Sequence, residues 1–192
     1  MDNKVKVILV DDDDDFATLF KKMITSDSRI DYLGRASNKA SGVALSFETS
    51  PDIVVMDLNL SGIALDGIEA AKEIRIKTGI KVLLLTAYEQ TEIILDASSR
   101  SFASGYIFKS QFQMMTHIIH RTVTSNTPEK EYIKELVLGK LSPAERRVLE
   151  DLINQNDNMI SSPSTINNQK TSIFKKLGIK NTKELLKVFS NW

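Results

Sequence analysis

The sequence contains no cysteine, which excludes disulfide bonds, thiolate nucleophiles and the usual structural zinc sites. The two histidines, His117 and His120, are too few to replace them. Their spacing of three lets them share one helix face, where a partly exposed pair is favoured over a metal site. The sequence also lacks an apolar run of membrane-spanning length, and the charged start at 1–6 lacks a signal-peptide core. We therefore expect a cytoplasmic protein with no membrane partner.

Charge of either sign is ordinary in amount but uneven in distribution. Residues 1–127 carry 14 Lys and Arg against 17 Asp and Glu, whereas residues 128–192 carry 11 against 8. The total length of 192 residues allows one domain of typical size and a second small one. An acidic part followed by a basic part suggests that the second part binds nucleic acid.

The segment around Asp57 organises the N-terminal part of the chain. An unbroken apolar run, Ile53 to Met56, follows Pro51 and is typical of a strand buried on both faces of a parallel sheet. Asp57 then lies at the carboxyl end of this strand, at the edge of an open α/β sheet where ligands bind.

Other predicted strands end in residues of related chemistry. These residues are Asp11 and Asp12, Thr86, and Lys109. Because strands and amphipathic helices alternate, the pattern predicts an α/β fold with a five-stranded, parallel, doubly wound (flavodoxin-like) sheet. On the helix predicted between Gly67 and Thr78, Arg75 is expected to face outward. Three carboxylates at one edge repel one another unless a cation binds, and Mg²⁺ suits an all-oxygen site.

An acidic pair, an aspartate, a threonine followed by alanine, and a lysine occur in this order at strand ends. In these features residues 4–124 resemble the receiver domains of two-component response regulators. The resemblance implies that a sensor histidine kinase phosphorylates Asp57 and that Mg²⁺ is the cofactor. The implied Mg²⁺ ligands are Asp11, Asp12, Asp57 and the backbone carbonyl of Asn59.

The resemblance also implies roles for residues around the phosphoacceptor. Lys109 and Thr86 would assist the chemistry, and Thr86 with Tyr106 would form the switch. We expect no enzymatic activity beyond the chain's own phosphorylation and dephosphorylation. Asn59 and Tyr88 would flank the path of the hydrolytic water, and the Tyr88 ring is expected to lengthen the phosphorylated state.

Two local features depart from the simplest pattern. Asp13, Asp14 and Asp15 continue the acidic run, and we interpret them as the start of a helix rather than as an expanded metal site. After Asp57, serine stands at position 61 where receivers usually carry proline, and residues 63–65 resemble a small insertion in the loop.

The C-terminal part carries strong helix signals. Ser142, Pro143 and Glu145 have the spacing of a capping box with proline at the first helical position. A second helix is predicted over 164–177, followed by Gly178 as its stop. Its polar face offers amides for base edges and lysines for phosphates. The candidate DNA-binding residues are Asn167, Asn168, Lys170, Thr171, Lys175 and Lys176.

The segments 141–149 and 164–179 resemble the helix-turn-helix output domain of LuxR/NarL-type response regulators. The predicted division is a receiver domain at 1–124, a linker at 125–140 and a small all-α helix-turn-helix domain at 141–192. Between 154 and 163 the sequence is about six residues too short for the family's scaffold helix.

Two functions follow from this resemblance. The first is a phosphorylation-controlled, DNA-binding transcription regulator that can act as a homodimer. The second is a regulator whose degenerate output domain contacts a protein partner. A stand-alone enzyme of phosphoryl transfer is disfavoured, because nothing beyond self-phosphorylation is encoded.

Overall fold

The computed structural model describes residues 4–60, 66–155, 162–190 and 192. The insertion predicted at 63–65 and the centre of the shortened segment, 156–161, therefore lie outside the described residues. Within the described parts of the chain, no helix is both long and apolar enough to cross a membrane.

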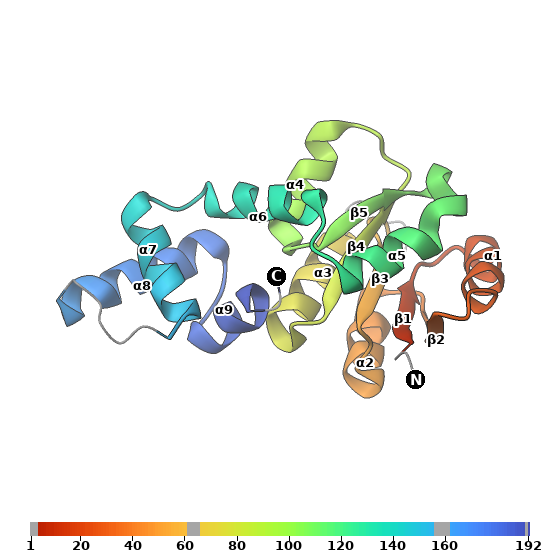
Figure 1. The fold of residues 1–192 in the computed structure, drawn as a ribbon, viewed down its shortest axis with the longest axis horizontal. Coiled ribbons are helices and arrows are strands. Elements are labelled where there is room, and N and C mark those ends of the chain that lie inside the picture. The colour runs from red at the N-terminus through yellow and green to blue at the C-terminus, as the bar shows by residue number, and fades with distance from the viewer. Residues whose placement is uncertain (1–3, 61–65, 156–161, 191) are drawn as a thin grey trace.

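The N-terminal part is built on one sheet of five parallel strands, in the order β2-β1-β3-β4-β5 (Figure 1). The strands are β1 (Val5–Val10), β2 (Ile30–Ala36), β3 (Ile53–Asp57), β4 (Lys81–Thr86) and β5 (Gly105–Phe108). β3 is buried along its whole length, as its unbroken apolar sequence predicts. The doubly wound α/β fold predicted from the sequence is confirmed.

Helices cover both faces of this sheet. They are α1 (Asp14–Thr25), α2 (Lys39–Thr49), α3 (Asp66–Thr78), α4 (Thr91–Ser101) and α5 (Met115–Thr124). α1 and α5 pack on one face of the sheet, and α2, α3 and α4 pack on the other. The carboxyl ends of the strands are thus left open as a common edge.

The acidic run after β1 begins a helix, as predicted. The Asp13 carboxylate caps α1 by accepting a hydrogen bond from the backbone N–H of Phe16 at 2.9 Å. This hydrogen bond lowers the pKa of Asp13, because it stabilises the ionised form. Asp14 and Asp15 lie in the first turn, where the helix dipole favours negative charge.

The chain does not pass directly from β5 into α5. A short 3-10 helix, η1 (Lys109–Met114), follows β5 directly, and α5 begins only at Met115. The backbone of Gln111 is not helical (φ −90°, ψ 26°), and its side-chain oxygen accepts a hydrogen bond from the N–H of Phe108. The chain therefore turns tightly as it leaves β5, with Lys109 at the edge of the sheet.

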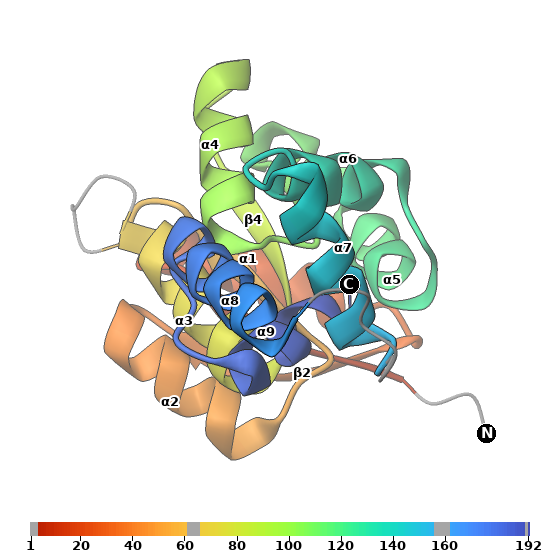
Figure 2. The same cartoon turned by 90° about the vertical axis from the view of Figure 1, so that its left-hand side faces the viewer.

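The C-terminal part is entirely helical in the residues that the structure describes, which confirms the predicted all-α class. Its helices are α6 (Pro128–Leu138), α7 (Pro143–Ile153), α8 (Pro163–Leu177) and α9 (Thr182–Phe189). α6 lies in the segment predicted as a linker, where Thr127 caps it and Pro128 occupies its first position. Figure 2 views the molecule from the side of α8 and α9.

The C-terminal helices share a hydrophobic core with the end of the sheet domain. Phe102, which ends α4, is 2% exposed and belongs to the same buried cluster as Leu149, Ile173 and Leu185. Ile76 of α3 also packs against this cluster. A small helical unit has little interior of its own, and here side chains from α3 and α4 contribute to its core.

Arg75 does not face outward as expected from the sequence. Its side chain is completely buried, and it donates to the carbonyl oxygens of Phe102 (3.0 Å), Gly79 (2.9 Å) and Val188 (2.8 Å). Burial lowers the pKa of this guanidinium to about 10. The helix periodicity around Arg75 could not reveal this position, because Val188 of α9 covers it from 113 residues further along the chain.

Candidate functional site

The open edge of the sheet brings together the carboxylates and the lysine predicted at strand ends. The Lys109 ammonium lies 3.1 Å from Asp57 Oδ2 and 2.9 Å from Asp11 Oδ2. Asp11 is fully buried and Asp57 is 6% exposed. The ring of Phe16 lies 4.6 Å from the same ammonium, so the cation is held between two acids and an aromatic face.

Burial dominates the electrostatics of Asp57. It raises the pKa of this carboxyl to about 6; the Lys109 ammonium and the N–H of Asn59 oppose the rise, and the Asp11 charge adds to it. Burial also works to lower the pKa of Lys109, but the adjacent carboxylates of Asp11 and Asp57 outweigh this and raise the pKa. The amine is therefore charged, and Asp57 is mostly ionised at neutral pH.

The acidic residues form a group of suitable chemistry for Mg²⁺. One oxygen from each of Asp11, Asp12 and Asp57 lies within 4.8 Å of the others. Asp11 Oδ2 is buried and receives no hydrogen bond of good geometry, although the Lys109 ammonium lies 2.9 Å away. A buried carboxylate oxygen with spare coordination capacity, beside an exposed carboxylate, fits a hard divalent cation.

Gly67 allows α3 to pack closely against the end of β3, which carries Asp57. Its N–H donates to the carbonyl oxygen of Leu58 at 3.1 Å. A Cβ atom at this position would lie 1.9 Å from the backbone oxygen of Asp57, far inside van der Waals contact. Glycine at position 67 is therefore a steric requirement for packing α3 against the end of β3.

The two predicted switch residues lie on neighbouring strands. Thr86 ends β4 and is 1% exposed, and its oxygen accepts a hydrogen bond from the N–H of Tyr88 at 2.9 Å. Tyr106 on β5 is half-buried and contacts Phe108 edge-on, with ring centroids 5.9 Å apart. Tyr106 also lines a cavity of about 310 Å³ with residues of α5 and Thr127, the cap of α6. A movement of its ring would therefore reach α6.

Asn59 and Tyr88, which the sequence predicts to flank the path of the hydrolytic water, contact each other directly. The Asn59 side-chain amide donates to the Tyr88 hydroxyl at 3.0 Å. This hydrogen bond joins the loop after β3 to the loop after β4 and positions the Tyr88 ring.

We expect Tyr88→Ala to shorten the lifetime of phosphorylated Asp57 by about tenfold, since about 1.4 kcal/mol of barrier corresponds to that factor. Tyr88→Phe keeps the ring and removes the hydrogen bond with Asn59, so it should have a smaller effect. Loss of ³²P from the purified phosphoprotein measures both rates. Equal lifetimes for Tyr88→Ala and the parent protein would contradict a shielding role.

The candidate DNA-binding residues lie on α8, and five of the six face solvent. Asn167, Asn168, Thr171, Lys175 and Lys176 are exposed, and Lys170 is half-buried. They share one helix, and their contact with DNA stays a prediction.

Lys176 has a partner that the sequence did not indicate. Its ammonium donates to Glu145 Oε2 at 2.6 Å, and Ser172 donates to Glu145 Oε1 at 2.6 Å. These hydrogen bonds lower the pKa of the buried Glu145 carboxyl to about 2. Glu145 also accepts from the N–H of Ser142, which confirms the predicted capping box. This network fastens the start of α7 to α8.

Arg35 makes a second contact that the sequence did not indicate, with the loop that follows β1. The Arg35 guanidinium at the end of β2 donates to the backbone oxygen of Asp11 at 2.9 Å and to the Asp14 carboxylate at 2.6 Å. It therefore holds the loop that carries the predicted metal-binding pair. No local pattern marks Arg35, because its partners belong to the loop after a different strand.

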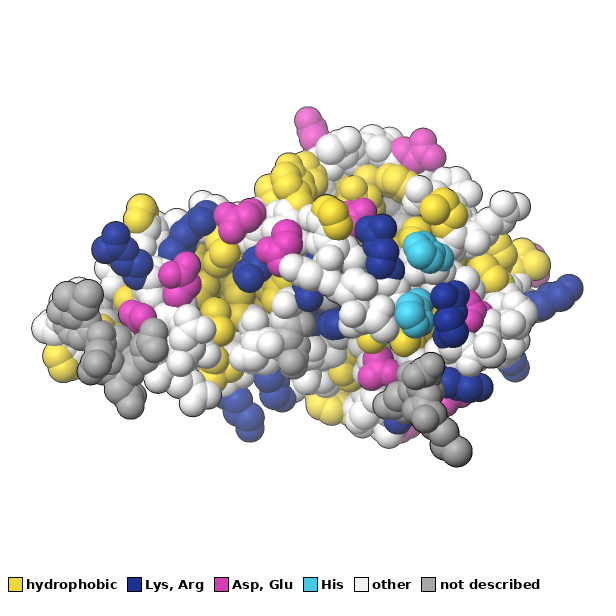
Figure 3. Space-filling model, viewed as in Figure 1, with side chains coloured by type: hydrophobic (Ala, Val, Ile, Leu, Met, Phe, Trp, Pro, Cys, Tyr) yellow, Lys and Arg dark blue, Asp and Glu magenta, His cyan; other side chains and the backbone are white. Residues whose placement is uncertain are grey.

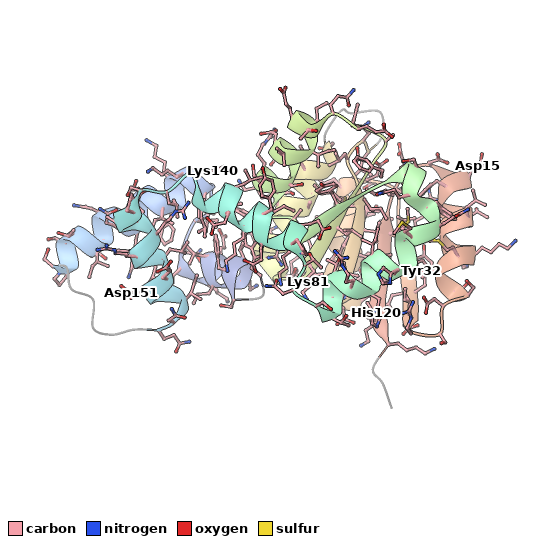
Figure 4. The ribbon with its side chains drawn as sticks, turned by 45° about the horizontal axis from the view of Figure 1, so that its top comes forward. Asp15, Tyr32, Lys81, His120, Lys140 and Asp151 are labelled. Atoms are coloured by element: carbon pink, nitrogen blue, oxygen red, sulfur yellow. The ribbon has the colours of Figure 1, made fainter. Side chains whose placement is uncertain are left out.

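The two histidines lie on one face of the molecule (Figure 3), and His120 is labelled on α5 in Figure 4. Among the described residues, the only group that could hold a metal is the acidic cluster of Asp11, Asp12 and Asp57. His117 is exposed and His120 is half-buried, as the interpretation of a partly exposed pair predicts.

Comparison with known proteins adds the family context. The family model described as the response regulator receiver domain matches residues 7–120. Response regulator GacA of Pseudomonas aeruginosa is 27% identical over 202 residues, which cover 94% of this chain and 93% of GacA. The nitrate/nitrite response regulator protein homolog of Haemophilus influenzae is 27% identical, over 73% of this chain and 67% of that protein. Transcriptional regulatory protein LiaR of Bacillus subtilis is 31% identical, but this chain spans about half of its length (47%).

Solved structures of response regulators also resemble this chain. A two-component response regulator of the LuxR family from an Aurantimonas species is 28% identical, with a TM-score of 0.58, over 76% of this chain and 99% of that chain. The Salmonella typhimurium response regulator RcsB shares the fold over 97% of both chains, with a TM-score of 0.58 and 23% identity.

Proposed function

The chain belongs to the response regulator receiver domain family, and we propose that a sensor histidine kinase phosphorylates it on Asp57 to control DNA binding by α8. The observation that carries this proposal is the arrangement of Asp57 beside the Asp11 carboxylate and the Lys109 ammonium.

The chemistry that this site supports is in-line phosphoryl transfer. An ionised Asp57 oxygen forms a bond to phosphorus while the phosphorus–nitrogen bond of the donor phosphohistidine breaks, and the electron pair returns to the imidazole. Lys109 offsets the negative charge that otherwise repels the two anions. When bound by Asp11, Asp12 and Asp57, Mg²⁺ supplies further positive charge against the phosphoryl oxygens. Beyond this reaction and hydrolysis of its product, we propose no further catalysis.

Thr86 is placed to sense the product. Its oxygen already accepts from Tyr88, so its own hydroxyl hydrogen remains to be donated to a phosphoryl oxygen. A turn of this hydroxyl would free space beside Tyr106, on the neighbouring strand. Because α6 packs against both α4 and β5, the resulting change would reach the C-terminal helices.

The direct test is fluorescence anisotropy with DNA fragments from the protein's own promoter region. We expect binding that strengthens when beryllofluoride and Mg²⁺ mimic phosphorylated Asp57, and that weakens steeply between two salt concentrations. No binding in any condition, together with a response of the protein to the mimic, would instead indicate a protein partner for the output helices.

The polar face of α8 gives a sharper prediction for this DNA complex. Lys175→Ala should weaken binding to all sequences alike and lower the salt slope by about 1. Asn168→Ala should cost about 1–3 kcal/mol for the specific site alone. Lys21→Ala, an exposed lysine on α1, is the control and should bind as the parent does. Unchanged slope and affinity in Lys175→Ala would argue against α8 as the DNA-binding helix.

A further inference from the structure

We propose that a cavity between the sheet and α6, at the edge opposite Asp57, binds a small multivalent anion. The cavity has a volume of about 450 Å³, within the range of small-molecule sites. Its lining includes Lys81, the first residue of β4, together with Lys130 of α6 and Trp192. One carboxylate, that of Asp52, also lines the cavity, and it accepts a hydrogen bond from the N–H of Lys6 at 2.8 Å. Figure 4 labels Lys81. The proposed site is separate from the phosphorylation site, since its lining does not include Asp57.

The cavity concentrates positive charge. Lys130 is only 7% exposed, although lysine is seldom buried without a partner. Lys81 is half-buried and donates one hydrogen bond, to the Val123 carbonyl oxygen at 2.6 Å. Its two remaining N–H groups are available to a ligand.

Burial and neighbouring positive charges destabilise the charged form of both lysines. Burial lowers the pKa of Lys81, and the charges of Lys130 and Arg75 lower it further. The Asp52 carboxylate opposes these effects and raises the pKa. Burial likewise lowers the pKa of Lys130; the Glu131 charge opposes this, and the charges of Arg75 and Lys134 add to it. Arg75 directs its N–H groups to carbonyl oxygens, so it contributes charge without competing as a donor. An anion in the cavity would relieve this repulsion and accept from both lysines.

Trp192 forms an aromatic wall of the cavity. Its indole N–H donates to the Lys130 carbonyl oxygen at 3.3 Å, and its ring lies 5.1 Å from that of Phe189 and 6.2 Å from that of Phe102, between ring centroids. The ring is thus held in place by packing. An anion that carries a planar group, such as a nucleoside diphosphate, could stack on it.

Occupancy of this cavity would act on the output helices. Its walls come from the sheet domain and from the α6 and C-terminal segments together. An anion that touches Lys81 and Lys130 therefore stabilises the packing of these segments against each other. By linkage, any DNA-binding form in which the segments separate would bind the anion less tightly.

Trp192 is the single tryptophan of the chain, so its intrinsic fluorescence reports directly on the cavity. The full chain is titrated with pyrophosphate, citrate and adenosine diphosphate, in EDTA to prevent metal-mediated binding at Asp57. Sodium chloride at matched ionic strength serves as the reference. We expect a saturable change with at least one of the three anions and none with chloride.

Charge variants then locate the binding. Lys81→Gln and Lys130→Gln should each weaken binding by about tenfold or more. Lys134→Gln is the matched control, since it removes a lysine one turn along α6 that does not line the cavity. Thermal melts followed by circular dichroism establish which variants are folded. Because two lysines are replaced separately, the test still holds if one of the two variants does not fold.

The pattern of responses identifies the ligand or refutes the site. Binding of pyrophosphate without citrate indicates a phosphate ligand, and the reverse indicates a polycarboxylate. Tighter binding of adenosine diphosphate than of pyrophosphate indicates stacking on Trp192. A response that never saturates, or an equal loss of affinity in Lys134→Gln and Lys130→Gln, would overturn the proposal.

Discussion

Replacing Asp57 with asparagine is expected to abolish phosphorylation and, at neutral pH, to stabilise the fold. The amide keeps the shape of the carboxylate but provides no anionic oxygen to attack phosphorus. Incubation with a small-molecule phosphodonor and Mg²⁺, followed by intact-protein mass spectrometry, measures the first effect. Phosphate addition to Asp57→Asn at the parent's level would show that another residue is the acceptor.

The expected gain in stability follows from the pKa of Asp57. Burial raises this pKa from 3.8 to about 6, so the folded protein holds a proton that the unfolded chain releases between these values. The free energy of unfolding therefore decreases as the pH rises from about 4 to 6. The ionised carboxylate costs about 1–3 kcal/mol above this range, by the conversion of about 1.4 kcal/mol per pKa unit.

Urea titrations at pH 7.5 and pH 4.5 measure this effect. Asp57→Asn should be more stable than the parent at pH 7.5 by about 1–3 kcal/mol, and the difference should shrink at pH 4.5. Asp31→Asn, at an exposed position on β2, is the control and should change stability by less than about 0.5 kcal/mol. A loss of stability in Asp57→Asn at pH 7.5 would mean that the Lys109 ion pair outweighs the cost of burial.

Arg75→Met is expected to destabilise the protein by at least about 3 kcal/mol, because it leaves several buried carbonyl oxygens without their donor. Methionine retains much of the aliphatic volume, so the loss reports chiefly on the hydrogen bonds to Phe102, Gly79 and Val188. Since Val188 belongs to α9, the substitution should also loosen the C-terminal helices from α3.

Two measurements separate these consequences. Urea unfolding gives the change in free energy, and Trp192 fluorescence reports local loosening, because the Arg75 guanidinium lies 5.8 Å from the centre of the indole ring. Arg100→Met is the matched control. That arginine lies on α4 and makes partly exposed ion pairs with Asp96 and Glu69, so its loss should cost less than about 1 kcal/mol. Equal destabilisation by the two substitutions would contradict a special role for Arg75.

Local sequence patterns determined the fold class and the main chemistry of the phosphorylation site. Apolar runs and amphipathic periods indicate which residues a strand or helix buries, whichever element packs against it. Since parallel strands end at one edge, the order of elements was enough to bring Asp11, Asp57 and Lys109 together. Helix starts were equally local, as the capping box at Ser142 shows.

Contacts between segments distant in the sequence were decided only by the tertiary structure. Arg75 has the sequence surroundings of an exposed helix residue, yet α9 covers it and Val188 accepts its hydrogen bond. The sequence of α8 predicts that Lys176 contacts DNA, but its ammonium pairs with the buried Glu145 of α7. The cavity at Lys81 and Lys130 likewise exists only where two segments meet. In each case the environment of a charged group depends on which distant side chain or backbone group packs against it. The periodicity of a single helix does not identify that distant group.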